Sequence, residues 1–437
     1  MSPGQSTTQS ESLNLAGGLP VHLLPRQGPA ILSARLAIRG GSSADPGGGR
    51  GAHQLLAGLM TRGCADLDAE ALADLVEGAG AGLRAEALED ALVIGLKCAA
   101  ADAASLLPLL LAMVRQPKLE ADQLDLERQL NLQTLQRQRE DPFQLAHDQL
   151  RHSLYGSSPY GHDPLGVESD LESLSEVDLR PLVHQLGQAG AVLVLSGEIP
   201  DDLVRHLEQG LGGEPWPTCL PRPWVSSERW DSAAPPSQLA QLEQVTEQLV
   251  LMLGCPTVPL GHGDAVALRL LQAHLGLGMS SRLFVTMREE RGLAYDVGVH
   301  LPARCGASPF VMHLSTSADR AAEATECLLQ EWQRVMEQPL VEAELALALA
   351  KYRGQDAMGR QTCSQIAERQ ALVLSHGLPF DHVDRCLQRA DQLSPEAIRQ
   401  AAARWLSQPS LSLVGPAGAL AAAAGAWETG PFAARSR

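Results

Sequence analysis

Residues 50 to 60 read RGAHQLLAGLM and place one histidine, His53, among apolar residues at helical spacing. A histidine on a short helix is half of a common zinc-binding device, in which two imidazoles at i and i+4 share one helical face with a glutamate that acts as general base. His53 is therefore part of a working metal site, the remnant of one, or a partly buried core residue hydrogen-bonded to a nearby carbonyl.

A second stretch with chemistry-bearing residues is HLGLGMSSRLFVTMREERGLAYDVGV at 274–299, where Arg288 and Tyr295 stand seven residues apart. The pattern predicts a helix over Met279 to Glu290, which Gly292 ends, and a strand that begins at Tyr295. A plainer interpretation places the arginine in a surface network with neighbouring glutamates, the tyrosine at the edge of a core, and the glycines in a turn.

The bulk composition limits the class of protein. The chain has 437 residues, so two or more domains are expected. Its net charge of −17 argues against a nucleic-acid-binding surface but permits a basic peptide or a positively charged partner. Eight scattered cysteines without a CxxC pair fit a reduced compartment. The N-terminus resembles no signal peptide, and Lys97 and Asp102 interrupt the most apolar stretch, so we expect a soluble, cytoplasmic protein.

The chain contains an internal repeat with an offset of about 220 residues. Three landmarks recur in the same order: a Gln-Pro segment, a helix start beginning Leu-Ser, and a short apolar strand that ends in glycine. The pairs are QPKLEA at 116–121 with QPLVEA at 338–343, LSEVDLR at 174–180 with LSPEAIR at 393–399, and LVLSG at 193–197 with LSLVG at 411–415. Coincidence among Leu/Ala-rich helices is the alternative.

Each copy mixes strands with helix pairs and lacks strict β-α-β alternation. This pattern predicts an α+β fold of two similar halves, each a mainly antiparallel sheet with helices on one face. Ser175 and Ser394 are the expected N-caps of equivalent helices, with Pro395 at the first helical position. The expected organisation is a disordered tail at 1–12, domains at 13–212 and 241–417, a Pro/Gly-rich linker at 213–240, and a loose tail at 418–437.

Several segments, taken in order, resemble the pitrilysin/insulinase family of zinc metallopeptidases, which includes the mitochondrial processing peptidases. The matching segments are GLPVHLLPR, RGGSSADPGGGRGAH, LMTRG, LERQLNLQTLQRQREDP, SPYGHDPLG and MSSRLF followed by REERGLAY. The resemblance extends over essentially the whole chain, including its two halves.

The family's first helix carries His-x-x-Glu-His, and this chain departs from it. In the matching register only the first histidine, His53, is kept; Leu56 replaces the general base and Ala57 replaces the second ligand. The family's third ligand lies seven residues after Glu127 and falls on Thr134. One ligand of three does not hold zinc, so the resemblance implies a degenerate metal site and no metal in this chain. A replacement site that uses His147, His152 or His162 is the remaining alternative.

The second half keeps the family's arginine–tyrosine pair. The resemblance implies that Tyr295 donates to the oxyanion of the tetrahedral intermediate, that Arg288 holds a substrate carbonyl, and that both act in trans on a zinc site elsewhere. It also implies a substrate-binding loop that contains Gly276, Gly278, Ser280 and Ser281.

A first half without its metal ligands and a second half with its arginine–tyrosine pair together imply a non-catalytic subunit of a heterodimeric zinc peptidase. The expected partner is a zinc-bearing homologue, zinc is expected only in that partner, and the substrates are unfolded or short peptides. One alternative is a non-enzymatic scaffold or binding protein of the same fold. The other is an autonomous peptidase with an atypical metal site.

Overall fold

The computed structural model describes residues 10–217 and 237–433, which form two compact units. Each unit combines residues from both halves of the sequence. The first unit holds residues 10–135, 163–217 and 357–380, and the second holds residues 136–162, 237–356 and 381–433. The expected division at 13–212 and 241–417 therefore misses two exchanged segments, while most of the expected linker lies outside the described residues.

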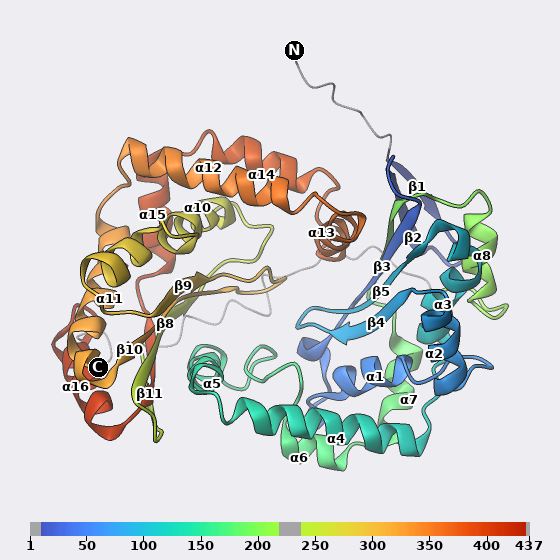
Figure 1. The fold of residues 1–437 in the computed structure, drawn as a ribbon, viewed down its shortest axis with the longest axis horizontal. Helices are drawn as coiled ribbons and strands as arrows, with labels where there is room; N and C mark the ends of the chain where they lie inside the picture. Colours follow the sequence, from blue (N-terminus) through green and yellow to red (C-terminus); the bar gives the residue numbers. More distant parts are fainter. Residues whose placement is uncertain (1–9, 218–236, 434–437) are drawn as a thin grey trace. The chain divides into compact units, whose positions relative to one another are not determined.

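The first unit is built on a six-stranded sheet in the order β1-β2-β6-β3-β5-β4 (Figure 1). Only β2 and β6 run parallel. The strands are β1 Glu11–Asn14, β2 Pro20–Pro25, β3 Ile31–Arg39, β4 Gly82–Ala87, β5 Ala91–Ala99 and β6 Ala191–Gly197.

Helices pack on one face of this sheet and bury its main core. The strand residues that alternate toward this face, such as Leu32, Leu36 and Ile38 of β3, are fully buried. The helices of the unit are α1 Ala52–Met60, α2 Ala69–Gly78, α3 Ala103–Arg115, α4 Ala121–Gln138, α6 Glu168–Ser173, α7 Glu176–Gln185 and α8 Leu203–Gln209, with 3₁₀ turns η1 Ser42–Ala44 and η2 Ala100–Asp102.

The second unit repeats this topology. Its sheet has the order β7-β11-β8-β10-β9, which corresponds to β2-β6-β3-β5-β4, and again the first pair alone is parallel. The prediction of two similar halves with mainly antiparallel sheets is confirmed. The strands are β7 Leu239–Glu243, β8 Gln248–Pro256, β9 Asp296–His300, β10 Pro309–Ser317 and β11 Ser410–Gly415.

The helices of the second unit complete the repeat. Ser394 caps α15 through the backbone N–H of Ala397, and Ser175 forms a capping box in α7, as predicted. The elements are α10 Ala265–Gly276, the π-helix η3 Phe284–Glu290, η4 Ala318–Arg320, α11 Ala321–Glu337, α12 Glu342–Met358, α14 His382–Ala390, α15 Pro395–Trp405 and α16 Ala417–Thr429.

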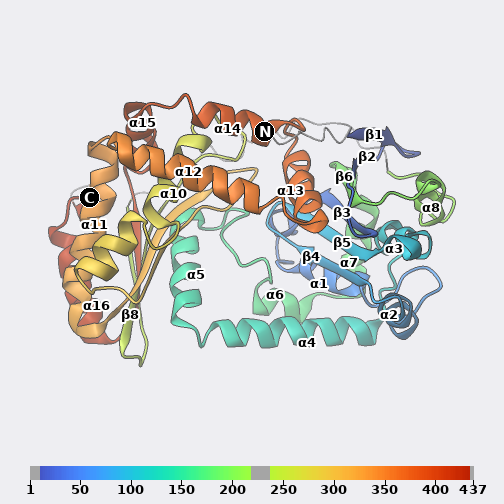
Figure 2. The ribbon, with the colours of Figure 1, turned by 45° about the horizontal axis from the view of Figure 1, so that its top comes forward.

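One helix is exchanged in each direction between the halves of the sequence. Helix α5, Pro142–Tyr155, comes from the first half but packs on β8 and β11 of the second unit. Helix α13, Cys363–Ser375, comes from the second half but packs on β3 and β6 of the first unit (Figure 2). Each helix covers the sheet face opposite the main core, so a helix lies on both faces of each sheet.

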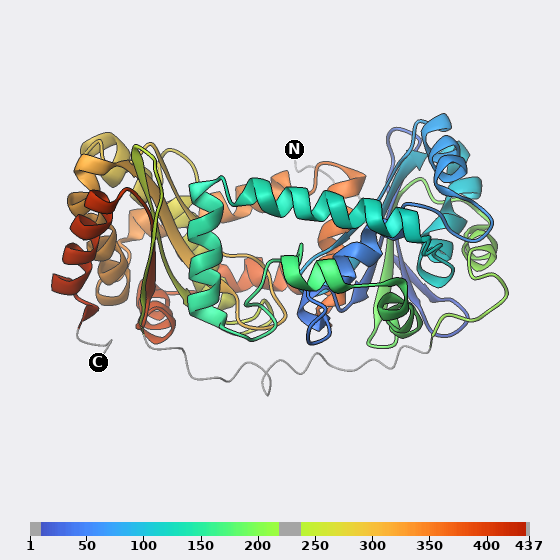
Figure 3. The same ribbon diagram turned by 90° about the horizontal axis from the view of Figure 1, so that it is seen from below.

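The C-terminal region differs from the expected loose tail. Residues Ala417–Thr429 form α16, the red helix in Figure 3, which packs on α11. Leu420 and Trp427 of this helix are buried. The alanine-rich composition of this segment lets it approach α11 closely, and the buried tryptophan anchors it. Of the expected N-terminal tail, residues 1–9 lie outside the described residues, and β1 begins at Glu11.

The most apolar stretch of the sequence is divided between β5 and α3. Within the described residues, none of the helices combines the length and apolarity that a bilayer span requires.

Candidate functional site

Helix α1 holds His53 in its first turn, and a carboxylate fixes the imidazole there. One oxygen of Asp45 lies 2.7 Å from His53 Nδ1 and accepts from the His53 backbone N–H at 3.0 Å. The other oxygen accepts from the Gly51 N–H at 2.7 Å. Asp45 therefore caps the positive end of α1 and orients the ring, which is buried. The partner is a carboxylate from the preceding loop and not the carbonyl that the sequence suggested.

The positions that would complete a zinc site face elsewhere. Leu56 and Ala57 are completely buried in the main core of the first unit. Thr134 lies exposed on α4, and its hydroxyl donates to the Leu130 carbonyl one turn earlier at 2.8 Å. Among the described residues, no set of three ligand groups that includes His53 converges on one point. The side chains of the degenerate motif therefore do not fit zinc.

The glutamate that marks the motif on α4, Glu127, has a structural role. It is nearly buried and forms an ion pair with Arg62 at 2.6 Å. Its carboxylate sits against Gly58 of α1, where a Cβ atom would lie 2.3 Å from the glutamate oxygen. Glu127 therefore fixes the approach of α4 to α1 and is engaged by a cation.

A second ion pair fixes the start of α1. Asp170 of α6 accepts from the Arg50 backbone N–H at 3.0 Å and from the guanidinium at 2.8 and 3.1 Å. The hydrogen bond from the Arg50 side chain is the main cause that lowers the pKa of Asp170 to about 2.

The alternative histidines belong to the other unit. His147 and His152 lie on α5, which packs on the second sheet, and His162 also falls in the second unit, whereas His53 belongs to the first. The expectation that the helix bearing His147 faces His53 came from its position in the sequence, and the exchange of α5 removes its basis.

The structure brings Arg288 and Tyr295 together in the second unit. Arg288 lies on the π-helix η3, a distortion often found at functional sites. Its Nη1 donates to the Tyr295 carbonyl at 3.0 Å, and its guanidinium carbon lies 5.3 Å from the Tyr295 ring centroid and 5.0 Å from that of Phe284. The hydrogen bond and the cation–π contacts together hold Arg288 beside Tyr295.

The exposure of Arg288 and Tyr295 differs from the plainer interpretation of these two residues, whereas Gly278 lies in a turn, as that interpretation expected. The Tyr295 side chain is 78% exposed, so it is not a core-edge tyrosine. Within the described residues, Arg288 has no carboxylate at ion-pair distance, although Glu289 and Glu290 are its neighbours in sequence. A large exposed aromatic beside an unneutralised guanidinium is typical of a binding surface.

Two sequence profiles of one peptidase family match the chain. The profile for insulinase (peptidase family M16) matches residues 25–166, and the profile for the peptidase M16 inactive domain matches residues 186–352. The chain belongs to the pitrilysin/insulinase (M16) family. The match of its second half to the inactive-domain profile makes it a member of the inactive type.

Two curated proteins and one solved structure are similar to large parts of this chain. A zinc protease of Streptomyces coelicolor, described as uncharacterized, is 25% identical over 305 residues, which cover 68% of this chain and 66% of that protein. A non-peptidase homolog of Helicobacter pylori is 22% identical over 380 residues, 86% of this chain and 85% of that protein. The solved structure of a peptidase M16 inactive domain from Pseudomonas fluorescens shares the fold with a TM-score of 0.84 at 23% identity, over 93% of this chain and 98% of that one.

The loop before Arg288 combines packed and open positions. A Cβ atom at Gly276 would lie 2.7 Å from the Val299 backbone nitrogen, so this glycine lets α10 pack against β9. Gly278, with φ +76°, is surrounded by open space. Ser280 is exposed, whereas Ser281 is buried and donates its backbone N–H to the Gly278 carbonyl at 3.0 Å. The substrate-binding role of these four residues stays a prediction, and the packing favours Gly278 and Ser280.

The helix before Tyr295 is shorter than predicted. It begins after the turn at residues 277–281 instead of at Met279 and is π-helical from Phe284 onward. Gly292, with φ +60°, ends it as predicted, and β9 begins one residue after Tyr295. The sequence did not suggest Asp45 as the residue that holds His53, although its position just before the glycine-rich turn leading into α1 was a usable signal.

Proposed function

We propose that this chain is the non-catalytic subunit of a heterodimeric zinc metallopeptidase of the M16 family. In this proposal it contributes Arg288 and Tyr295 to a zinc site carried by a homologous partner. The observation that carries the proposal is the contrast between a motif filled with core residues and an arginine–tyrosine pair that is ordered and exposed.

The proposed chemistry follows from the donors. The Tyr295 hydroxyl donates a hydrogen bond to the oxyanion of the tetrahedral intermediate, and Arg288, which is held by the Tyr295 carbonyl, binds a substrate carbonyl. Donors fixed before the reaction stabilise developing charge without reorganisation and contribute on the order of 10²–10³ in rate.

Peptide binding is supported by the position of the pair. Tyr295 directly precedes β9, which is an edge strand of the second sheet and, among the strands that the structure describes, pairs with β10 alone. An edge strand offers backbone groups to an extended peptide regardless of its side chains. A net charge of −17 further favours a positively charged partner face or basic substrates.

The alternative is a scaffold or binding protein that keeps the fold without any part in catalysis. Its support is the likeness to a non-peptidase homolog. The exposure of Arg288 and Tyr295 favours the subunit proposal, because a scaffold does not need oxyanion donors.

The decisive experiment measures peptide cleavage by the chain alone, by a zinc-bearing homologue alone, and by the two mixed. We expect no stoichiometric zinc and no cleavage for the isolated chain, and activity for the mixture. In the mixture, Tyr295→Phe should lower kcat by about 10²–10³ with little change in association. Tyr352→Phe, in α12 of the same unit, is the matched control.

Each outcome separates the two functions. If Tyr295→Phe leaves kcat at the level of Tyr352→Phe while the mixture cleaves, the chain is a scaffold. If the isolated chain binds zinc tightly and loses activity with a chelator, both proposals are wrong.

A further inference from the structure

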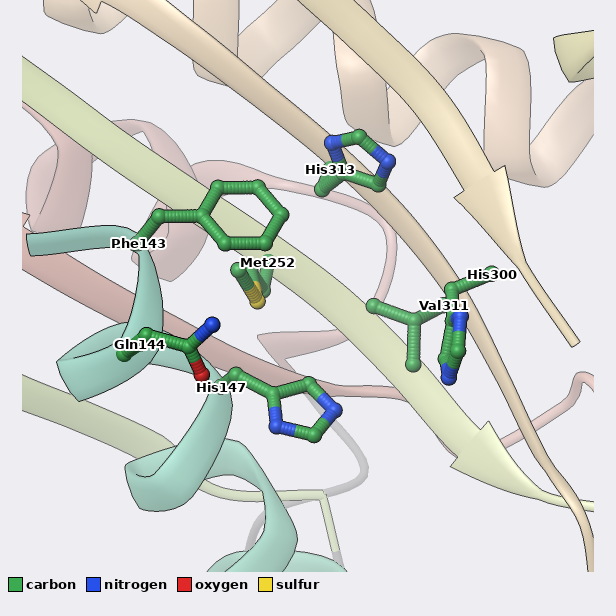
Figure 4. Close-up of a pocket in the computed structure, with 7 residues that line it drawn as sticks. All are labelled: Phe143, Gln144, His147, Met252, His300, Val311 and His313. Atoms are coloured by element: carbon green, nitrogen blue, oxygen red, sulfur yellow. The ribbon is translucent and has the colours of Figure 1, made fainter. Parts of the chain in front are cut away.

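A cavity of about 250 Å³ lies between α5 and the face of the second sheet on which this helix packs (Figure 4). At ~30 Å³ per water molecule, this volume corresponds to about eight waters. The lining residues come from α5, β8, β9 and β10 and are Phe143, Gln144, His147, Met252, His300, Val311 and His313. Neither Arg288 nor Tyr295 lines the cavity, so a ligand bound there is independent of the proposed function.

One part of the cavity wall is apolar and aromatic. Phe143, Met252 and Val311 contribute carbon and sulfur surface, and the Phe143 ring meets the His313 ring edge to face at 5.1 Å between centroids. Burial lowers the pKa of His313, so its ring is neutral near pH 7. Such a wall suits the flat face of a small planar ligand.

The three histidines at first suggest a transition-metal site, but the environment of His147 opposes it. Arg151, one turn along α5, donates from Nη2 to His147 Nδ1 at 3.2 Å. A guanidinium can only donate, so Nδ1 must carry the lone pair and the proton of the neutral ring is on Nε2. His147 is therefore a hydrogen-bond donor and not a metal ligand through Nε2. Among the described residues, His147, His300 and His313 do not form a convergent set of three ligand atoms.

The charges around the cavity are asymmetric. Arg151 is 8% exposed and pairs with the half-exposed Asp148 at 3.3 Å, so a largely desolvated cation lies behind His147. At the opposite side, the exposed carboxylate of Asp296 lies 3.8 Å from His313 Nδ1. That nitrogen is buried and has no hydrogen-bond partner within the described residues, as expected for the wall of a site that a small molecule occupies. An anionic group is favoured beside His147 and disfavoured beside Asp296.

We propose that this cavity binds a small planar carboxylate, with the carboxylate at His147 and the flat body between Phe143, Met252 and Val311. The Nε2–H of His147, backed by Arg151, donates a charge-assisted hydrogen bond to the ligand. The cavity accommodates a ligand of the size of benzoate, with about nine non-hydrogen atoms.

The test compares ligands of nearly the same shape and different charge by calorimetry on the full chain. Benzoate should bind at least about tenfold more tightly than benzamidine, with benzamide between them. His147→Phe, which removes the donor and fills space, should weaken benzoate binding at least about tenfold, whereas His152→Phe on the exposed side of α5 should change it less than about twofold. Nitrogen-15 NMR of the histidines should show the His147 proton on Nε2.

Three results would overturn the proposal. The first is the absence of benzoate binding below about 10 mM, the weakest affinity expected for a ligand of this size. The second is binding of benzamidine at least as tight as that of benzoate. The third is tight binding of Ni²⁺ or Zn²⁺ that His147→Phe abolishes, which would make the cluster a metal site. The comparison of ligands on the unmodified chain decides the question even if the His147 variant does not fold.

Discussion

Helices α1 and α10 follow equivalent strands in the two units, yet they serve different purposes. In α1 the two positions that the family resemblance assigns to the base and the second ligand, Leu56 and Ala57, are apolar and buried, and the one histidine is held by Asp45. Beyond α10, the chain forms a π-helix and exposes Arg288 and Tyr295. The two units have therefore diverged within one topology, one toward a sealed core and the other toward an open polar surface.

The largest expected effect comes from restoring the missing base in α1. Leu56→Glu places a carboxylate in a fully buried apolar core without a cation beside it, so it should destabilise the fold by about 3–5 kcal/mol. Leu75→Glu on α2, where the leucine is 36% exposed, should cost less than about 1 kcal/mol. Urea unfolding of both variants gives the two values. If both variants lost less than about 1 kcal/mol of unfolding free energy, the interior around Leu56 would accept a polar group and would not be a sealed apolar core.

The sequence alone indicated most of this contrast, because it rests on local features. These features are the replaced motif residues at Leu56, Ala57 and Thr134, and the spacing between Arg288 and Tyr295. The repeat also predicted that both units are α+β and have mainly antiparallel sheets, but it did not predict the order of the strands. The exchange of α5 and α13 was not predictable, because an amphipathic helix shows which of its faces is buried but not which sheet buries it. Similarly, the alanine-rich α16 lacks a strong apolar stripe, and only its contact with α11 explains its order.

The two exchanged helices, α5 and α13, differ in the size of the side chains that they bury. Helix α5 buries Leu150 against Val250, Met252 and Val311, whereas α13 meets its sheet largely through the small residues Ala367 and Ala371. Leu150→Ala should therefore lower the free energy of unfolding by about 2–5 kcal/mol, and Ala371→Gly should lower it by about 1–2 kcal/mol.

Chemical denaturation of the two variants measures this difference. Ala371→Gly is the matched change because it also removes buried carbon from the exchanged helix. A loss for Leu150→Ala no larger than that for Ala371→Gly would show that α5 is not held by its apolar face.

Helices α1 and α10 also differ in what surrounds their glycines. A Cβ atom at Gly276 would meet the Val299 backbone nitrogen at 2.7 Å, whereas one at Gly58 would meet the end of the Glu127 side chain. A packed backbone cannot move away as the end of a side chain can. Gly276→Ala should therefore lower the free energy of unfolding by about 1–3 kcal/mol, and Gly58→Ala should lower it by less.

The control for both is Gly78→Ala at the end of α2, where nothing lies within 4 Å of the added Cβ. Removing that glycine should stabilise the chain by about 0.4–1 kcal/mol. Thermal unfolding ranks the three variants by Tm. A lower Tm for Gly58→Ala than for Gly276→Ala would show that the Glu127 side chain, held by Arg62, yields less to the added Cβ than the Val299 backbone does.

The smallest expected effect concerns the ion pairs that fix the first turns of the two helices. Asp170 holds Arg50 before α1, and Asp264 holds Arg404 and Trp405 at the start of α10. Because Arg50 lowers the pKa of Asp170 from 3.8 to about 2, the ionised carboxylate stabilises the folded chain above the unfolded pKa, and this contribution is lost as the pH falls from about 4 to 2. Asp170→Asn should therefore lower Tm at pH 7, and its difference from the unmodified chain should shrink across that window. Calorimetric scans at a series of pH values measure the difference, and a gap that stays constant down to pH 2 would mean that the Arg50 contact does not depend on the charge of Asp170.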